Sequence, residues 1–276
     1  MATQLKYHGF DICCNPVGTL FNPDALATLL ERCADKRAFT TEDFLKNNGL
    51  NFCWETAHSL AGSELTEVIA KHEQARSQLT SYLMQSSHLV ITLGTSIVHE
   101  LRDGRIVANN HKQAGSLFTK RQMSPVEVEA GLNRIHTAAQ RLNPKIKIVV
   151  SVSPVRHTRE GMPQNAASKA TLLLAAQTFA IQDHVTYLPV YEMVMDELRD
   201  YRFFASDLIH LNATGVELVW SRFRESVHPD HQSRLDEVAA YRKLAAHKSR
   251  TDSIKHKSLV EAKRTALTQQ YNYLQL

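Results

Sequence analysis

Apolar runs and amphipathic segments follow one another along the chain and predict strands and helices in turn. Continuous apolar runs rich in β-branched residues are typical of parallel strands that are buried on both faces. Three such runs occur, at residues 88–94 (HLVITLG), 146–154 (IKIVVSVSP) and 185–191 (VTYLPVY). A shorter run at residues 10–14 (FDICC) predicts a fourth buried strand, which would include Cys13 and Cys14.

Helices are predicted between these runs by apolar residues that recur every three or four positions. Residues 65–83 show this spacing, and residues 124–144 add start and stop signals. Ser124 and Glu127 form a capping-box pattern, and Asn143-Pro144 ends the segment. Further helices are predicted at residues 24–34, 167–181, 192–200 and 212–227, and the chain opens on the last turn of a helix capped by Gly9.

Strands that alternate with helices predict an α/β fold with a parallel, doubly wound sheet, covered by helices on both faces. This domain would occupy residues 1–229. Residues 230–276 contain two helical runs and no strand pattern, so they predict a basic helical tail that is partly mobile. Residues 35–62 are polar and irregular and predict no regular element.

Composition narrows the class of protein. The chain has 276 residues, of which 43% are hydrophobic and 22% charged, as in ordinary globular proteins. It has no apolar run of about 18 residues and no basic segment followed by an apolar core at its start, so neither a membrane span nor a signal peptide is expected. Its four cysteines have the spacing of neither a disulfide framework nor a zinc site. These features predict a cytoplasmic protein with reduced thiols.

The net charge of +4 is unevenly placed. Residues 231–276 carry nine basic and four acidic side chains, whereas residues 1–230 carry 23 basic and 24 acidic ones. A nearly neutral body does not favour a nucleic-acid-binding domain. The sequence contains no P-loop and no G-x-G-x-x-G turn after a strand, and His99 and His111 lack metal-ligand spacing. We therefore expect no metal and no cofactor.

Polar residues follow the predicted strands. Because ligands of open α/β sheets bind outside the carboxyl ends of the strands, these residues are the first candidates for a site. A plain loop residue is the alternative for each of them. The candidates are Gly18 after the first strand, Thr95 and Ser96 after the second, Arg156 and His157 after the third, and His111 and Lys112 in the turn region 105–115.

The segment SDLIHLNATG places Asp207 three residues before His210, just ahead of a predicted helix. A carboxylate at this spacing can orient the imidazole through one nitrogen and leave the other as a general base, which is the second half of a Ser-His-Asp relay. The alternative is a turn-capping aspartate beside a surface histidine, because D-x-x-H is short and common. Nucleophiles by residue type alone are Ser96, Ser151 and Ser153, none of which lies in a G-x-S-x-G elbow.

Six segments, taken together and in this order, resemble the GSCFA family, which belongs to the SGNH (GDSL-like) hydrolase superfamily. The resemblance covers roughly residues 3 to 228. The segments are NPVGTLFNP (15–23), ITLGTSIVHE (91–100), VANNHK (107–112), VSPVRH (152–157), SKATLL (168–173) and YEMVMDELRDYRFFASDLIH (191–210).

This resemblance implies a three-layer, flavodoxin-like fold and ester hydrolysis, with His210 as general base and Asp207 as its partner. It also implies Gly18 as an oxyanion-hole residue. Many relatives have G-x-N-D where this chain has Gly94-Thr95-Ser96-Ile97, so Asn109 takes the oxyanion asparagine role by substitution, with Gly94 as a further candidate. The substrate wall would include Arg156 or His157, which touch substrate or brace the His210 loop. The alternative is a structural loop held by Pro154.

The chain departs from the family at the signature that gives the family its name. No Gly-Ser-Cys-Phe-Ala sequence occurs in it, so the first strand and the serine after that strand are missing. We expect an N-terminally truncated chain that is inactive without the upstream serine. Loss of that strand would leave a gap of roughly 9–10 Å between residues 10–14 and 88–94.

Two functions of different classes remain. The first is an acyl or acetyl esterase that acts on a small-molecule or carbohydrate-linked ester, with no cofactor and no nucleic-acid partner. The second is a non-catalytic protein that keeps the fold and binds a ligand or partner. In a third interpretation the basic tail contacts a partner or a membrane surface, but its four acidic residues and the lack of interleaved aromatic residues argue against a nucleic-acid site.

Overall fold

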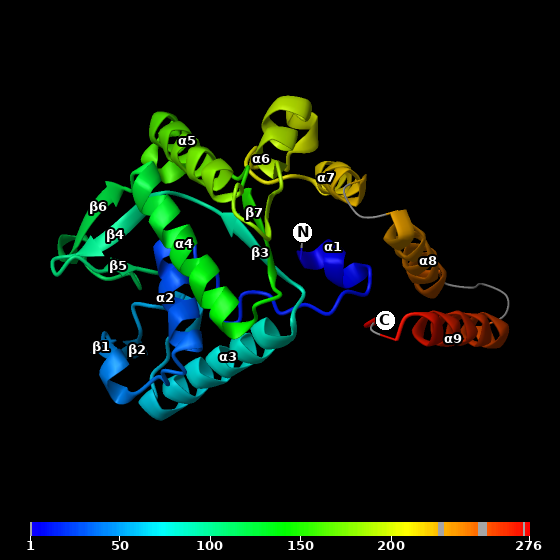
Figure 1. The fold of residues 1–276 in the computed structure, drawn as a ribbon, viewed down its shortest axis with the longest axis horizontal. Coiled ribbons are helices and arrows are strands. Elements are labelled where there is room, and N and C mark those ends of the chain that lie inside the picture. Colours follow the sequence, from blue (N-terminus) through cyan, green and yellow to red (C-terminus); the bar gives the residue numbers. More distant parts are fainter. Residues whose placement is uncertain (1, 226–228, 248–252, 273) are drawn as a thin grey trace. The chain divides into compact units, whose positions relative to one another are not determined.

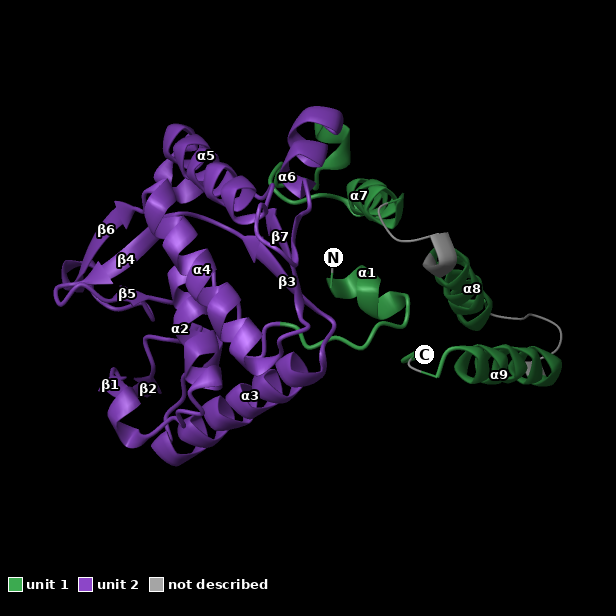
Figure 2. Cartoon of the chain, in the orientation of Figure 1, with its two compact units in different colours: residues 1–14, 200–276 green, residues 15–199 purple. Residues whose placement is uncertain are grey.

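The computed structural model describes residues 2–225, 229–247, 253–272 and 274–276. These residues form two compact units, shown in different colours in Figure 2. Unit 1 consists of residues 1–14 and 200–276, and unit 2 consists of residues 15–199. The domain boundary between residues 229 and 230 stays a prediction, and the compact units divide the chain elsewhere.

Unit 2 contains a parallel sheet, two strands of which, β3 and β7, are labelled in Figure 1. Its strands are β3 (His88–Leu93), β7 (Lys147–Val152) and β8 (Val185–Tyr187), in the order β3-β7-β8. Leu93 pairs with Val152, so the carboxyl ends of β3 and β7 lie at the same edge. The predicted α/β class with a parallel sheet is therefore confirmed, and three of the four predicted strands form this sheet.

Four long helices accompany the sheet in unit 2. Their apolar faces and the strands bury a common core that includes Leu132, Ile135, Ile148, Val150 and Phe179. Each such side chain contributes roughly 1.5–3 kcal/mol through burial. The helices are α2 (Pro23–Ala34), α3 (Leu65–Gln85), α4 (Pro125–Leu142) and α5 (Met162–Phe179).

The helix ends follow the predicted signals closely. Ser124 Oγ accepts a hydrogen bond from the Glu127 N–H at 3.3 Å, and the Glu127 carboxylate accepts one from the Ser124 N–H at 2.7 Å. This reciprocal capping box starts α4. At the start of α2 the cap is Asn22, whose Oδ1 accepts from the Ala25 N–H at 2.8 Å.

Five short strands form two antiparallel sheets, and the sequence pattern predicted neither sheet, although it allowed a short strand within residues 105–115. One is a hairpin of β1 (Leu45–Asn47) and β2 (Leu50–Phe52). Its turn residues Asn48 and Gly49 both have positive φ angles, of 49° and 78°, as a two-residue hairpin turn requires. The other sheet has the order β5-β4-β6 and contains β4 (Ile97–Leu101), β5 (Ile106–Val107) and β6 (Phe118–Gln122).

Two expectations about strands are wrong. Residues 10–14 form no strand, and Cys13 is half-buried while Cys14 is exposed. An apolar run becomes a β-strand only when another strand hydrogen-bonds to it. No described residue forms a β-pair with residues 10–14. Strand β3 is not fully buried either, because it pairs only with β7 in the described sheet and the Val90 side chain is exposed.

Unit 1 is helical. Its long helices are α7 (Ala213–Glu225), α8 (Pro229–Ala246) and α9 (Ser253–Gln270), and α1 (Ala2–Tyr7) opens the chain. Gly9 caps α1 as predicted, with a φ of 80° and a 3.1 Å hydrogen bond from the Phe10 N–H to the Leu5 carbonyl. Buried Leu235 and Val238 give α8 an apolar side, so the helical runs of the tail are confirmed.

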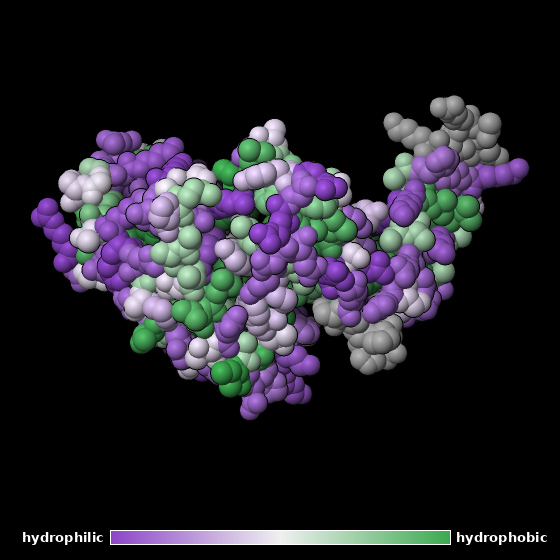
Figure 3. Space-filling model, turned by 90° about the horizontal axis from the view of Figure 1, so that it is seen from above, coloured by the Kyte–Doolittle hydropathy of each residue, from purple (hydrophilic) through white to green (hydrophobic). Residues whose placement is uncertain are grey.

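None of the helices in the described ranges has both the length and the apolar character needed to cross a membrane. Figure 3 shows apolar residues scattered among hydrophilic ones on the face that it presents. Short helical turns connect the longer elements: η1 (Thr41–Asp43), η2 (His58–Leu60), η3 (Gly115–Leu117), η4 (Thr158–Glu160), α6 (Val190–Glu192), the π-helical η5 (Met193–Glu197) and η6 (Tyr201–Phe203).

Candidate functional site

Asp207 and His210 meet in the loop before α7. The Asp207 Oδ2 and His210 Nδ1 atoms lie 2.7 Å apart. The other carboxylate oxygen, Oδ1, accepts hydrogen bonds from the main-chain N–H groups of Ile209 and His210 at 2.9 and 3.0 Å. The carboxylate therefore caps the turn and holds the imidazole at the same time.

The protonation state of this pair follows from its hydrogen bonds. The side chain of His210 and the N–H groups of His210 and Ile209 lower the pKa of Asp207 to about 2. An ionised carboxylate only accepts hydrogen bonds, so Nδ1 of His210 carries the hydrogen. In the neutral ring, Nε2 is then the basic nitrogen. The His210 side chain is 63% exposed and that of Asp207 is 46% exposed, so solvent reaches both.

The loop around the pair is held by backbone and amide contacts. The Ala205 N–H donates to the His210 carbonyl at 2.7 Å. The Asn212 side-chain amide donates to the Arg202 carbonyl at 2.6 Å, and its oxygen accepts from the Gly215 N–H at 3.0 Å. A side chain at Gly215 would come within 2.6 Å of a main-chain oxygen. The D-x-x-H geometry thus rests on a closely packed entry into α7.

Gly18 lies in the loop before α2, in unit 2. Its φ is 82°, and its N–H donates to the Asn15 carbonyl at 2.8 Å. A Cβ atom at this position would lie 2.3 Å from Ala57 Cβ. Glycine is therefore required here by the backbone conformation and by packing, and its N–H is already engaged within the turn.

Asn109, His111 and Lys112 form one tight turn. The Asn109 Oδ1 accepts from the His111 N–H at 2.8 Å, and both His111 and Lys112 have positive φ angles. The His111 ring is buried, stacks on Phe52 and hydrogen-bonds through Nε2 to the Cys53 carbonyl at 2.8 Å. Burial lowers the pKa of His111 to about 4, so the ring is neutral. Lys112 is exposed.

Gly94, Thr95 and Ser96 follow β3. Ser96 is fully buried, and its main-chain N–H donates to Ser168 Oγ at 2.8 Å. The Ser168 hydroxyl also lies 3.1 Å from both the Thr95 and the Ser96 hydroxyl oxygens. These contacts join the end of β3 to α5. The Ser151 hydroxyl is also buried, 3.0 Å from the Thr92 hydroxyl.

Arg156 and His157 follow β7, in the segment VSPVRH. The His157 N–H donates to Asn165 Oδ1 at 2.9 Å, and its ring meets Phe21 edge-on with centroids 5.8 Å apart. Burial lowers the pKa of His157, and the charge of Lys169 lowers it further. Burial raises the pKa of the Tyr191 phenol, and the charge of nearby Arg156 offsets part of that rise.

The candidates of unit 1 are Asp207 and His210, which lie together. In unit 2, Gly94 lies beside His157, and Asn109, His111 and Lys112 form one turn. The His111 ring contacts the ring of His58, and Gly18 packs against the neighbouring Ala57, so this turn and Gly18 meet the same short segment. In the described part of the chain, no group of three or more His, Cys, Asp or Glu side chains is arranged to hold a metal ion.

Sequence reasoning missed Lys169. This residue of α5 is 1% exposed, and its Nζ donates to the Gly94 carbonyl at 2.5 Å. Burial lowers its pKa to about 8. One sequence signal was present, because Lys169 shares helical spacing with Asn165, Leu172 and Ala176, which are all buried.

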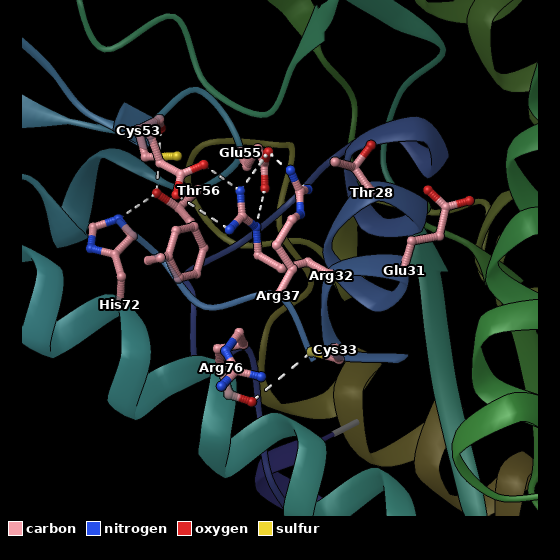
Figure 4. Close-up of polar contacts among 12 residues, drawn as sticks. Thr28, Glu31, Arg32, Cys33, Arg37, Cys53, Glu55, Thr56, His72 and Arg76 are labelled. Carbon is pink, nitrogen blue, oxygen red and sulfur yellow. Dashed lines mark hydrogen bonds and ion pairs between the residues drawn. The ribbon is translucent and has the colours of Figure 1, made fainter. Parts of the chain in front are cut away.

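A second buried polar cluster surrounds Arg32 (Figure 4). The Arg32 guanidinium contacts the carboxylates of Asp43 at 2.6 Å and Glu55 at 2.7 Å, and it donates to the Ala38 carbonyl. Nearby, Thr56 Oγ1 and His72 Nε2 lie 2.8 Å apart. Each of these polar groups has a protein partner, so the cluster holds α2 against the loops after it.

These observations define a mixed α/β protein with a parallel sheet and a His–Asp pair on a loop before a helix. The sequence model of the GSCFA family matches residues 1–223. The chain therefore belongs to the GSCFA family, as its motifs predicted. No curated protein matches the chain.

Proposed function

We propose that this protein is an ester hydrolase of the SGNH (GDSL-like) type with a flavodoxin-like arrangement of the α/β unit. The observation that carries the proposal is the 2.7 Å hydrogen bond between His210 Nδ1 and the Asp207 carboxylate. Family membership supports the same conclusion. The substrate class that we propose is a small-molecule or carbohydrate-linked ester.

His210 is the general base in this mechanism. The Asp207 carboxylate fixes the Nδ1–H tautomer, so Nε2 accepts the proton from an attacking hydroxyl and then returns it to the leaving alcohol. The carboxylate also stabilises the imidazolium that forms between these two steps. Three hydrogen bonds hold the carboxylate in place, so the ring is oriented before a substrate arrives.

The proposal assigns the attacking hydroxyl to a serine or to water. Ser96 and Ser151 are buried and hydrogen-bonded to neighbouring hydroxyls, so neither is assigned the role. Without a serine nucleophile, a triad enzyme keeps a residual enhancement of about 10³–10⁴ over water. We therefore expect low turnover of activated esters by residues 1–276.

The test is hydrolysis of p-nitrophenyl acetate by the 276-residue chain and three variants. His210→Ala removes the base and should abolish the enzymatic component. Asp207→Asn keeps the shape but loses the tautomer control, so it should remove most of that component. His247→Ala, an exposed histidine of the same unit, is the matched control and should hydrolyse the ester as the parent chain does. Equal rates for the parent, His210→Ala and His247→Ala proteins would refute the proposal.

A further inference from the structure

Two successive main-chain N–H groups converge on one oxygen at the end of β3. The N–H groups of Gly94 and Thr95 both donate to the Phe21 carbonyl, at 3.3 and 3.4 Å. Consecutive N–H groups that point to one oxygen form a concave site that favours a negative charge. Both bonds are longer than the usual 2.9–3.0 Å, so this neutral carbonyl satisfies the two donors weakly.

The other side of the same turn carries a buried positive charge. Lys169 Nζ donates to the Gly94 carbonyl, which belongs to the same peptide group as the Thr95 N–H. An ammonium on the carbonyl polarises that peptide group and strengthens its N–H as a donor. Among the described residues, no carboxylate forms an ion pair with Lys169, so none of them compensates its charge.

The turn is fixed in position and has little room for a side chain. Ser168 anchors it through the Ser96 N–H and the Thr95 hydroxyl. A Cβ atom at Gly94 would lie 3.2 Å from Phe21 Cδ1 and 3.5 Å from His157 Nε2. The imidazole nitrogen of His157 therefore lies beside the turn, on the side that the absent Gly94 side chain would occupy.

We propose that the Gly94–Thr95 turn binds the carboxylate group of an acidic ligand through its two main-chain N–H groups, with Lys169 as the counter-charge behind the peptide. The Phe21 carbonyl occupies the position of one carboxylate oxygen, and the exposed Phe21 ring marks the approach. An ionised acceptor makes shorter and stronger hydrogen bonds than a carbonyl, which favours its exchange for a carboxylate. The inference uses neither Asp207 nor His210, so acetate binding can be tested separately from ester hydrolysis.

Acetate tests the site in the full chain. The ¹⁵N-labelled protein is titrated with sodium acetate, and sodium chloride at equal ionic strength is the reference. The Gly94 and Thr95 amide protons should show a saturable downfield shift with acetate only. Lys169→Met should weaken acetate binding by about tenfold or more, because the charge assistance is lost. Lys145→Met removes an exposed lysine before β7 and should bind acetate as the parent protein does.

A second variant tests the site without removing the buried charge. In Gly94→Ala the added methyl group meets the Phe21 ring while Lys169 keeps its charge, so acetate binding should again weaken. Amide spectra away from the turn report whether each variant is folded. The inference is wrong if acetate gives no saturable shift beyond the chloride reference, or if folded Lys169→Met and Gly94→Ala proteins bind acetate as tightly as Lys145→Met.

Discussion

Arg32 and Lys169 are both fully buried cations, but they differ in the charge of the groups that surround them. Arg32 is 0% exposed and meets two carboxylates, Asp43 and Glu55. Lys169 is 1% exposed and is hydrogen-bonded to one neutral carbonyl, that of Gly94. Burial disfavours the charged form in both cases, and only the partners differ.

The pKa shifts record this difference. Burial alone would lower the pKa of Arg32, but the hydrogen bonds from its guanidinium to Glu55 and Asp43 outweigh burial, so the pKa is raised. For Lys169, burial is the cause of the shift, and its pKa falls to about 8. A paired buried cation is part of the framework. An unpaired one is a charge that the fold retains at a cost, which is the property expected of a ligand-binding group.

The largest effect is expected from breaking the paired cluster. Arg32→Met removes the cation and leaves two carboxylates without their partner in a half-buried environment. The free energy of unfolding should fall by about 3–5 kcal/mol. Urea denaturation at pH 7 measures this loss. The control is Arg37→Met, since exposed Arg37 contacts Glu55 at 3.5 Å and its loss should cost at most about 1 kcal/mol. Equal losses for the two variants would contradict the framework role of Arg32.

Lys169 should give the next largest effect, as a dependence of stability on pH. Its pKa in the folded protein, about 8, lies below the ordinary value of 10.5. Between these values the unfolded chain binds the proton and the folded protein does not, so stability rises with pH in this window. Relative to Lys169→Met, the stability of the parent protein should increase by about 3 kcal/mol from pH 7.5 to 10.5.

The difference between the two proteins isolates Lys169, because other lysines and tyrosines titrate in both. Urea denaturation at pH 7.5, 9 and 10.5 measures it. A constant difference across this range would show that Lys169 has an ordinary pKa, and the contrast with Arg32 would then disappear.

Local signals in the sequence were sufficient for much of the fold. The Ser124–Glu127 capping box and the Gly9 cap depend on residues at most five positions apart, and the structure contains both. The Asp207–His210 hydrogen bond has the same local origin. The hairpin at Asn48-Gly49 also had a local signal, which the polar composition of its flanks obscured.

Long-range relations could not be predicted in the same way. The partners of Arg32 lie 11 and 23 residues away, in loops whose course depends on packing. Lys169 meets a carbonyl 75 residues away. Residues 10–14 form no strand, although their apolar pattern favours one, because the pattern does not specify which strand would pair with them. Buried charges and strand neighbours are tertiary properties, and the pattern along a single chain does not specify them.

Geometry as well as charge contributes to the Arg32 cluster. Arg32→Lys keeps the positive charge but replaces a planar fork by a single ammonium, which cannot bond Asp43, Glu55 and the Ala38 carbonyl in the same directions. The expected loss of stability in urea is about 1–3 kcal/mol. A loss as large as that of Arg32→Met would mean that the fork geometry, and not the charge, accounts for the whole effect.

Arg134 provides the smallest and most discriminating test, because it has two carboxylate partners but is only partly buried. Its guanidinium joins α4 to α2 through Asp24 at 2.6 Å and Glu31 at 2.7 Å, and its side chain is 39% exposed. The number of partners equals that of Arg32, so the two residues differ mainly in burial. Solvent screens an exposed pair and hydrates the carboxylates after the cation is removed.

Arg134→Met should therefore lower the free energy of unfolding by only about 1 kcal/mol, and about 0.5 M sodium chloride should reduce that effect further. Arg32→Met should keep most of its loss at the same salt concentration, because the Arg32 guanidinium is fully buried and screening ions do not reach it. Urea denaturation of both variants with and without salt provides the comparison. Arg134→Met could instead match Arg32→Met in the size of its stability loss and in its response to salt. In that case the number of ionic partners, and not the burial of the cation, would determine how much each arginine contributes to the free energy of unfolding.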